Sequence, residues 1–291
     1  LQVISGINNF DKSLVTRVAR AAKMGGMLIG HWGPHPLRCY TGATHIDIAC
    51  DPELVAAAKE IVGDDVFICV SDVAADRFEQ AVRAGADMVE IGNFDGLYEQ
   101  GGAISREEVL TLTRDTRALL PNTPLSVTVP HTMAMDQQVD LAMELEALGA
   151  DLIQTEGKFS LDPQQGGIRG AIERAAPTLA ATYAIAKAVN IPVMAASGIS
   201  EVTAGMAIAA GASGVGVGSA VNKLNSDIAM VAVVKALAAS VGKTVVCDPT
   251  AFALSVFLTL PELDSNCLMP RPQLPKLSLH KPLIEVSGPS V

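Results

Sequence analysis

Short apolar runs alternate with longer stretches of mixed polarity along most of the chain, a pattern typical of strands that each lead into a helix. The runs that predict strands are residues 3–6, 43–49, 66–70, 88–92, 125–129, 152–155, 193–196 and 214–217. Helices are predicted over 12–23, 52–62, 76–84, 106–120, 136–148, from the glycine-rich loop 164–170 to about 189, between the last two strands, and over 227–241. Eight such repeats predict a parallel sheet that closes into a (β/α)8 TIM barrel of the ribulose-phosphate-binding or aldolase type.

Two segments depart from this alternation. Residues 27–42 separate the first predicted helix from the second strand, where a short turn would suffice, so we interpret them as an atypical insertion in a barrel of residues 1–246. Residues 247–291 lose the periodicity and become rich in proline, which predicts an irregular tail. Because the sequence starts inside the first apolar run, we expect an N-terminally truncated barrel, with any transit peptide upstream.

The composition suits one large α/β domain with a buried sheet. The chain has 291 residues, of which 49% are hydrophobic and 18% charged, and no apolar run approaches the length of a membrane span. Its formal net charge of -10 argues against nucleic acid and anionic membranes as partners. Any bound phosphate must therefore be held by local groups against the overall field. A homo-oligomer is compatible with these properties.

The cysteines do not form a disulfide or metal pattern. All five are scattered without a CxxC pair, which is typical of reduced thiols in an intracellular or organellar compartment. In the insertion, His31, His35 and Cys39 follow a four-residue spacing. Pro34 and Pro36 prevent the continuous helix that would align them, so we predict no metal site there.

Two glycine turns close the last two predicted strands. Ser197, Gly198 and Ile199 follow one of these strands, and Gly218 and Ser219 follow the other. In (β/α)8 barrels the loops after strands seven and eight bind phosphate through main-chain N–H groups, and glycine lets the backbone approach the anion. These five residues are therefore the predicted phosphate or cofactor site. The alternative is that the glycines only let helices pack on the strands.

Active sites of this architecture lie where strands end, so polar residues at these positions are candidates for chemistry. Glu90 is the predicted general acid/base, with Glu156 second, because an inward carboxylate in a low-dielectric barrel mouth has a raised pKa. His131 is predicted to supply the partner proton or to orient a ligand, and Asp47 is a further catalytic candidate. The predicted substrate contacts are Asn8, Asn9, Asn93 and Gln154.

These residues also have structural interpretations. Glu90 and Asp47 could instead form a buried ion pair or a hydrogen-bonded layer of the barrel. His131 follows Pro130 and could belong to a turn. The residues leave these alternatives open.

Several blocks of the sequence resemble one known family. They are ISGINNFD, ATHIDIACDP, GADMVEIGNFDGLYEQG, LLPNTPLSVTVPHT, LGADLIQTEG and ASGISEVTAGMAIAAGASGVGVGSAV. The chain is similar over them to the hypothetical chloroplast reading frame twenty-three (Ycf) family of plastids and cyanobacteria. The resemblance implies an aldolase-type barrel in a chloroplast or a cyanobacterial cytoplasm, and it supplies no reaction.

Two wider resemblances imply different chemistries. GADMVEIG, with the glycine turns, is similar to the tryptophan synthase α subunit, which implies a lyase or isomerase acting on a phosphorylated substrate with Glu90 as acid/base. The usual FSDP context of that enzyme is missing here. PVMAASGI with GASGVGVGSA is similar to FMN-binding barrels of the enoyl reductase and nitronate oxidase kind, which implies FMN in the same turns. A barrel that senses a phosphorylated metabolite without turning it over is the third hypothesis.

Overall fold

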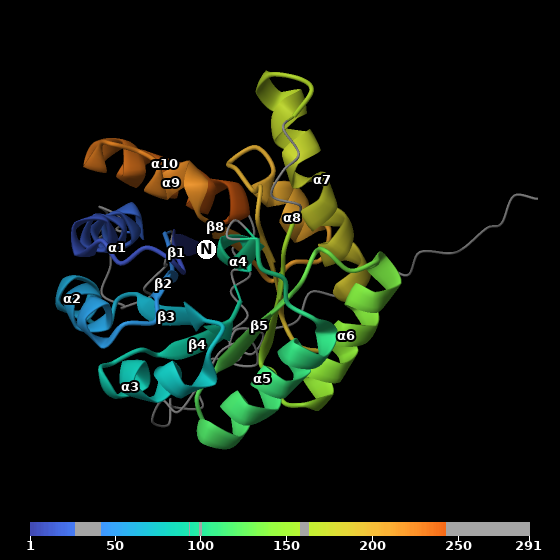
Figure 1. Cartoon of the computed structure of the whole chain (residues 1–291). Helices are drawn as coiled ribbons and strands as arrows, with labels where there is room; N and C mark the ends of the chain where they lie inside the picture. Colours follow the sequence, from blue (N-terminus) through green and yellow to red (C-terminus); the bar gives the residue numbers. More distant parts are fainter. Residues whose placement is uncertain (27–41, 93, 99–100, 158–162, 243–291) are drawn as a thin grey trace, which may run out of the picture. The chain divides into compact units, whose positions relative to one another are not determined.

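The computed structural model describes residues 1–26, 42–92, 94–98, 101–157 and 163–242, so the predicted tail and all but the last residue of the predicted insertion lie outside the described residues. Eight parallel strands pair in chain order, and the last pairs with the first to close a barrel (Figure 1). They are β1 (Gln2–Gly6), β2 (His45–Ala49), β3 (Phe67–Asp72), β4 (Met88–Ile91), β5 (Leu125–Val129), β6 (Leu152–Thr155), β7 (Val193–Ala196) and β8 (Gly214–Val217). The (β/α)8 barrel predicted from the sequence is confirmed.

The long helices surround the strands in Figure 1. In chain order the helical elements are α1 (Lys12–Gly26), α2 (Pro52–Val62), the 3₁₀ helix η1 (Ala75–Arg77), α3 (Phe78–Arg83), α4 (Asp95–Tyr98), α5 (Arg106–Leu119), α6 (Met135–Ala147), α7 (Gly167–Ile185), α8 (Ala204–Ala209), α9 (Ser219–Asn222) and α10 (Asp227–Val241). The short helices α4 and α9 were not predicted, because a single helical turn has no periodicity to detect.

Side chains alternate along each strand between the helices and the barrel interior. The outward positions belong to the hydrophobic core under the helices, as in Val3, Ile46, Ile68, Val89, Val127, Ile153, Ala195 and Val215. The inward positions of most strands are polar and still buried, as in Gln2, Asp47, Glu90, Ser126 and Gln154. Barrel interiors are normally filled by branched aliphatic side chains. The polar interior therefore sets this barrel apart and locates one part of the candidate site.

Three inward polar residues and a glycine lie at one level of the interior. Gln154 contacts Glu90 through a hydrogen bond, Asp47 raises the pKa of Glu90 by its charge, and a Cβ on Gly216 would lie 3.7 Å from the side-chain oxygen of Gln154. All four come from even-numbered strands, as the members of one barrel layer do. We call Asp47, Glu90, Gln154 and Gly216 the polar layer.

Candidate functional site

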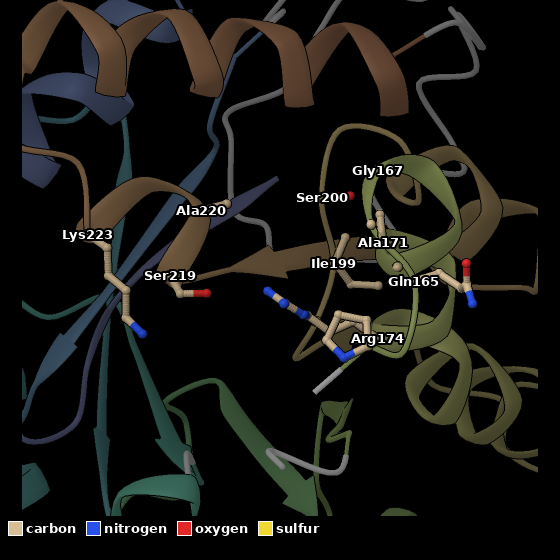
Figure 2. Close-up of a pocket in the computed structure, with 13 residues that line it drawn as sticks. Gln165, Gly167, Ala171, Arg174, Ile199, Ser200, Ser219, Ala220 and Lys223 are labelled. Atoms are coloured by element: carbon tan, nitrogen blue, oxygen red, sulfur yellow. The ribbon is translucent and has the colours of Figure 1, made fainter. Parts of the chain in front are cut away.

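A pocket of about 510 Å³ opens where the last strands end. Its lining comes from the loop before α7, from α7, from the turn after β7 and from α9 (Figure 2). The lining residues are Pro163, Gln165, Gly166, Gly167, Gly170, Ala171, Arg174, Gly198, Ile199, Ser200, Ser219, Ala220 and Lys223. Three of the five residues predicted for the phosphate site, Gly198, Ile199 and Ser219, are among them. The other two, Ser197 and Gly218, each directly precede a lining residue.

The turn after β7 has a backbone that only certain residues adopt. Ser197 has a φ of 78° and is the one non-glycine residue with positive φ in the described part of the chain, and Gly198 follows with a φ of 71°. The hydroxyl of Thr178 on α7 donates to the carbonyl of Ser197 at 2.7 Å and braces this turn. A Cβ on Gly198 would lie 2.6 Å from the carbonyl oxygen of Arg174. Glycine is therefore required at 198 both by conformation and by space, and strained turns of this kind gather at functional sites.

Two cations give the pocket a positive charge. Arg174 extends from α7 toward the side of the pocket that holds Ser219, and Lys223 lies on that same side beyond Ser219 (Figure 2). Among the described carboxylates, none forms an ion pair with Arg174 or Lys223. The N-terminus of α7 also faces the pocket, and its N-cap, Gly166, provides no side-chain hydrogen bond. Free cations and uncapped N–H groups attract an anion.

Arg174 and Lys223 were not among the site residues predicted from the sequence. Lys223 lies one helical turn after Ser219, and Arg174 follows the glycine-rich loop by about one turn. Both positions were therefore within reach of an argument from helical spacing around the predicted turns.

Glu90 lies beneath the mouth of the barrel and is fully buried. Its Oε1 accepts hydrogen bonds from Gln154 Nε2 at 2.5 Å and from Thr128 Oγ1 at 3.1 Å. Its Oε2 is buried and has no hydrogen-bond partner among the described residues. This geometry is the hydrogen-bonded barrel layer that the sequence left as an alternative, so the acid/base role of Glu90 stays a prediction.

The pKa of Glu90 is raised well above its usual value. Burial is the largest cause, and the negative charges of Asp47 and Glu156 raise the pKa further, against the hydrogen bond from Thr128 and the nearby amide of Gln2. No basic side chain of the described residues forms an ion pair with Glu90. These surroundings therefore favour the neutral carboxylic acid form of Glu90, which can donate a proton.

His131 and Glu156, two of the predicted catalytic candidates, follow β5 and β6 and lie together in the structure. The Nδ1 atom of His131 lies 2.9 Å from Glu156 Oε2, and the ring of Tyr98 from α4 meets the His131 ring edge-on at 5.1 Å. The His131 side chain is 14% exposed and that of Glu156 is 4% exposed. The pair is thus nearer to solvent than Glu90.

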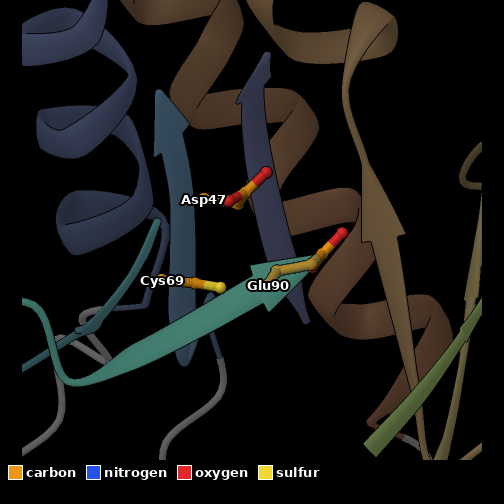
Figure 3. Close-up of side chains that lie close together, drawn as sticks. All are labelled: Asp47, Cys69 and Glu90. Atoms are coloured by element: carbon orange, nitrogen blue, oxygen red, sulfur yellow. The ribbon is translucent and has the colours of Figure 1, made fainter. Parts of the chain in front are cut away.

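Asp47 brings a second acid close to Glu90. It accepts a short hydrogen bond from the hydroxyl of Ser71. Single ligand atoms of Asp47, Cys69 and Glu90 all lie within 4.8 Å of one another, on three neighbouring strands (Figure 3). A borderline divalent metal could use this donor set if all three groups lost their protons. Burial and the neighbouring carboxylates instead raise the pKa of the Cys69 thiol, which favours the protonated form.

The remaining predicted contacts lie elsewhere. Asn9 donates to the Ser5 hydroxyl at 2.7 Å and accepts from the backbone N–H of Asp11 at 3.1 Å, so it organises the turn into α1. Asn8 is exposed in the same turn. Asn93 lies outside the described residues. Gln154 contacts Glu90 inside the polar layer and not the pocket.

Fold and site together define an aldolase-type (β/α)8 barrel with a cationic pocket at the ends of its last strands. The family model described as "Protein of unknown function (DUF561)" matches residues 36–247. The chain is 44% identical to the ycf23 protein of Cyanophora paradoxa over 79% of its length and 88% of that protein. It is 35% identical to the ycf23 protein of Pyropia yezoensis over 79% of its length and 78% of that protein. The chain therefore belongs to the Ycf23 family.

Two of the solved structures with the same fold are named as enzymes of phosphorylated compounds. A 3-hexulose-6-phosphate synthase matches with a TM-score of 0.55 and 16% identity, covering 83% of this chain and 100% of that one. Thiamine phosphate pyrophosphorylase from Pyrococcus furiosus matches with a TM-score of 0.51 and 20% identity, covering 83% and 94%. At these identities the likeness establishes the fold alone. Within the described ranges, no helix combines the length and apolarity that crossing a membrane requires.

Proposed function

We propose that this barrel binds a small phosphorylated molecule in the pocket between α7, the turn after β7 and α9. The observation that carries the proposal is the pair of cations, Arg174 and Lys223, which have no carboxylate partner in the described part of a chain with net charge -10. Two cations that line one pocket without carboxylate partners create a local positive potential, which attracts an anion even in an acidic protein.

The pocket offers phosphate three kinds of donor. The turn at Gly198 and Ile199 supplies main-chain N–H groups, Ser200 and Ser219 supply hydroxyls, and the two cations supply charge-assisted hydrogen bonds. Loops after strands seven and eight hold phosphate in many barrels of this class, which supports the assignment. The phosphate would anchor the substrate and leave its other end toward the barrel axis.

We propose that the bound molecule is turned over by a lyase or isomerase reaction with Glu90 as the acid/base. A Cβ on Gly157 would lie 3.5 Å from Ser197, so Glu156 is next in the chain to a residue that touches the pocket turn. Glu156 in turn contacts His131, and its negative charge raises the pKa of Glu90. These contacts support a reacting centre over His131, Glu156 and Glu90, with the phosphate at its side. Relatives from algae support a chloroplast location.

Calorimetric titration with inorganic phosphate, followed by phosphorylated sugars, tests the binding site. Arg174→Gln and Lys223→Gln are each expected to weaken phosphate binding by about tenfold or more, because a hydrogen bond to a charged group contributes roughly 1.5–3 kcal/mol. Arg169→Gln is the matched control, since Arg169 is also on α7, is exposed and does not line the pocket. Equal affinities for the Arg174 and Arg169 variants would place the site elsewhere.

Native mass spectrometry and an absorbance scan of the freshly purified protein test the chemistry. A colourless protein carrying a sugar phosphate supports the proposal, whereas a bound mass of FMN with flavin absorbance replaces it by a redox function. Glu90→Gln is expected to abolish turnover while phosphate affinity persists. If that variant retains the cellular function of the protein, the barrel is a sensor and not an enzyme.

A further inference from the structure

The two oxygens of the Glu90 carboxyl have different surroundings. Oε1 accepts from Gln154 Nε2 and from Thr128 Oγ1, at 2.5 and 3.1 Å. Oε2 is equally buried, yet no partner within the described residues reaches it. A neutral carboxylic acid has the same asymmetry, because one of its oxygens is a carbonyl acceptor and the other carries the proton.

Gln154, Thr128 and Glu90 are hydrogen-bonded to one another, and the donors of this group point towards Oε1 of Glu90. The Nε2 group of Gln154 has two N–H donors, one directed at Glu90 Oε1 and the other at Thr128 Oγ1, 3.2 Å away. The hydroxyl of Thr128 is then left to donate its own hydrogen to Glu90. Both donors therefore end on the same carboxyl oxygen, and that oxygen must act as an acceptor.

The backbone at Gly92 packs directly over this set. A Cβ at that position would lie 2.6 Å from Glu90 Oε1 and 2.1 Å from Thr128 Oγ1. A residue with a side chain would push these groups apart, so glycine preserves the arrangement. The close packing on the Oε1 side leaves Oε2 as the oxygen with free hydrogen-bonding capacity.

From this geometry we propose that Gln154 is a positioning residue: together with Thr128 it holds Oε1 of Glu90 as the carbonyl oxygen, so that the exchangeable proton is carried on Oε2. This inference rests on the acid/base role proposed for Glu90. The ionisable groups around the carboxyl are Asp47 on β2, Cys69 on β3 and Glu156 at the end of β6. All three are acidic, and among the described residues neither these groups nor the nearby Gln2 amide on β1 makes a hydrogen bond to Oε2.

The assignment changes the role predicted for Gln154 from the sequence, where it was a substrate contact. A buried amide that donates a hydrogen bond to one oxygen of a carboxylic acid keeps the acid's proton on the other oxygen, from which it is then transferred. Without Gln154 the proton is free to occupy either oxygen, so the expected effect on turnover is a lower kcat with an unchanged KM. Removal of a substrate contact would raise KM instead.

Infrared difference spectroscopy of the ligand-free protein tests the proposal directly. The C=O stretch of a protonated carboxyl lies apart from the amide bands and falls in frequency as the oxygen accepts hydrogen bonds. The band that is lost in Glu90→Gln belongs to Glu90. In Gln154→Met and in Thr128→Val, that band is expected to persist and to shift to higher frequency, further in the variant that combines both changes.

Ser126→Ala is the matched control. Ser126 is the inward residue opposite Glu90 on β5, is fully buried, and has a hydroxyl without a partner among the described residues. Its removal is expected to leave the band in place. Thr128→Val keeps the test available if Gln154→Met does not fold, because valine has the shape of threonine.

Three results would overturn the assignment. If neither Gln154→Met nor Thr128→Val moves the band, the proton lies on Oε1 with the Gln154 amide reversed. If no band is lost in Glu90→Gln, Glu90 is ionised. If one equivalent of Zn²⁺ removes the band, Asp47, Cys69 and Glu90 form a metal site. None of these measurements needs a substrate. A result that contradicts the role of Gln154 is therefore independent of whether phosphate binds at Arg174 and Lys223.

Discussion

The cationic pocket and the polar layer belong to the same barrel and are built in opposite ways. The pocket lies at the rim, its two cations are exposed, and its shape depends on backbone turns at Ser197 and Gly198. The polar layer lies inside, and its two acids, Asp47 and Glu90, are fully buried. Water screens the rim charges, while burial changes the protonation state of the interior groups. A ligand can thus be attracted at one place and exchange protons at another.

The two regions should differ most in how much the loss of a side chain lowers the free energy of unfolding. Glu90→Ala leaves a cavity and removes the acceptor of Gln154 Nε2 and Thr128 Oγ1, so it is expected to lower the free energy of unfolding by roughly 3 kcal/mol. Arg174→Ala, on the exposed rim, is expected to change it by less than about 0.5 kcal/mol. Urea unfolding at pH 7 measures both. Equal effects would mean that the polar layer is not a packed part of the core.

Gly198 is a rim residue whose substitution should nevertheless lower the stability of the protein. Gly198→Ala forces a Cβ against the carbonyl oxygen of Arg174 at a left-handed backbone position, and such strain costs about 1–3 kcal/mol. Phosphate affinity should fall as well, because the turn supplies N–H groups. Gly166→Ala is the control, since a Cβ there meets no atom within 4 Å and the φ of -85° suits any residue. If both variants unfold alike, the turn at 198 carries no special constraint.

The interior acid should make stability depend on pH. Folding raises the pKa of Glu90 above its unfolded value of 4.5, so above pH 4.5 the folded protein keeps a proton that the unfolded chain releases. Stability should therefore fall as pH rises from 4.5 toward the folded pKa, by at most about 1.4 kcal/mol per pH unit. Glu90→Gln removes this dependence. The measurement is the difference in unfolding free energy between wild type and variant from pH 5 to 8, and a difference that does not change with pH contradicts the assignment.

The turns that form the rim could be predicted from local sequence more readily than the contacts of the interior. The turns at Gly198 and Gly218 follow apolar runs, so a local pattern was enough to expect an anion site there. Arg174 and Lys223 each lie about one helical turn beyond a predicted turn, but their convergence on one pocket from two helices is visible only in the folded barrel. Strand alternation correctly indicated that Glu90 points inward. Its depth, and the partners Thr128 and Gln154 from other strands, depend on barrel closure, which no local pattern records.

The smallest expected effect separates the causes of the raised pKa of Glu90. Burial comes first and the charge of Asp47 second, while Glu156 contributes least. Asp47→Asn keeps the shape of the side chain and an oxygen that can accept from Ser71, but it removes the charge. The pKa of Glu90 should fall and yet stay above its usual value, because burial is unchanged. In pH titrations of the Glu90 infrared band, Glu156→Gln is the control and should give a smaller downward shift. If its shift is the larger one, the charge that acts on Glu90 comes from the rim and not from within the polar layer.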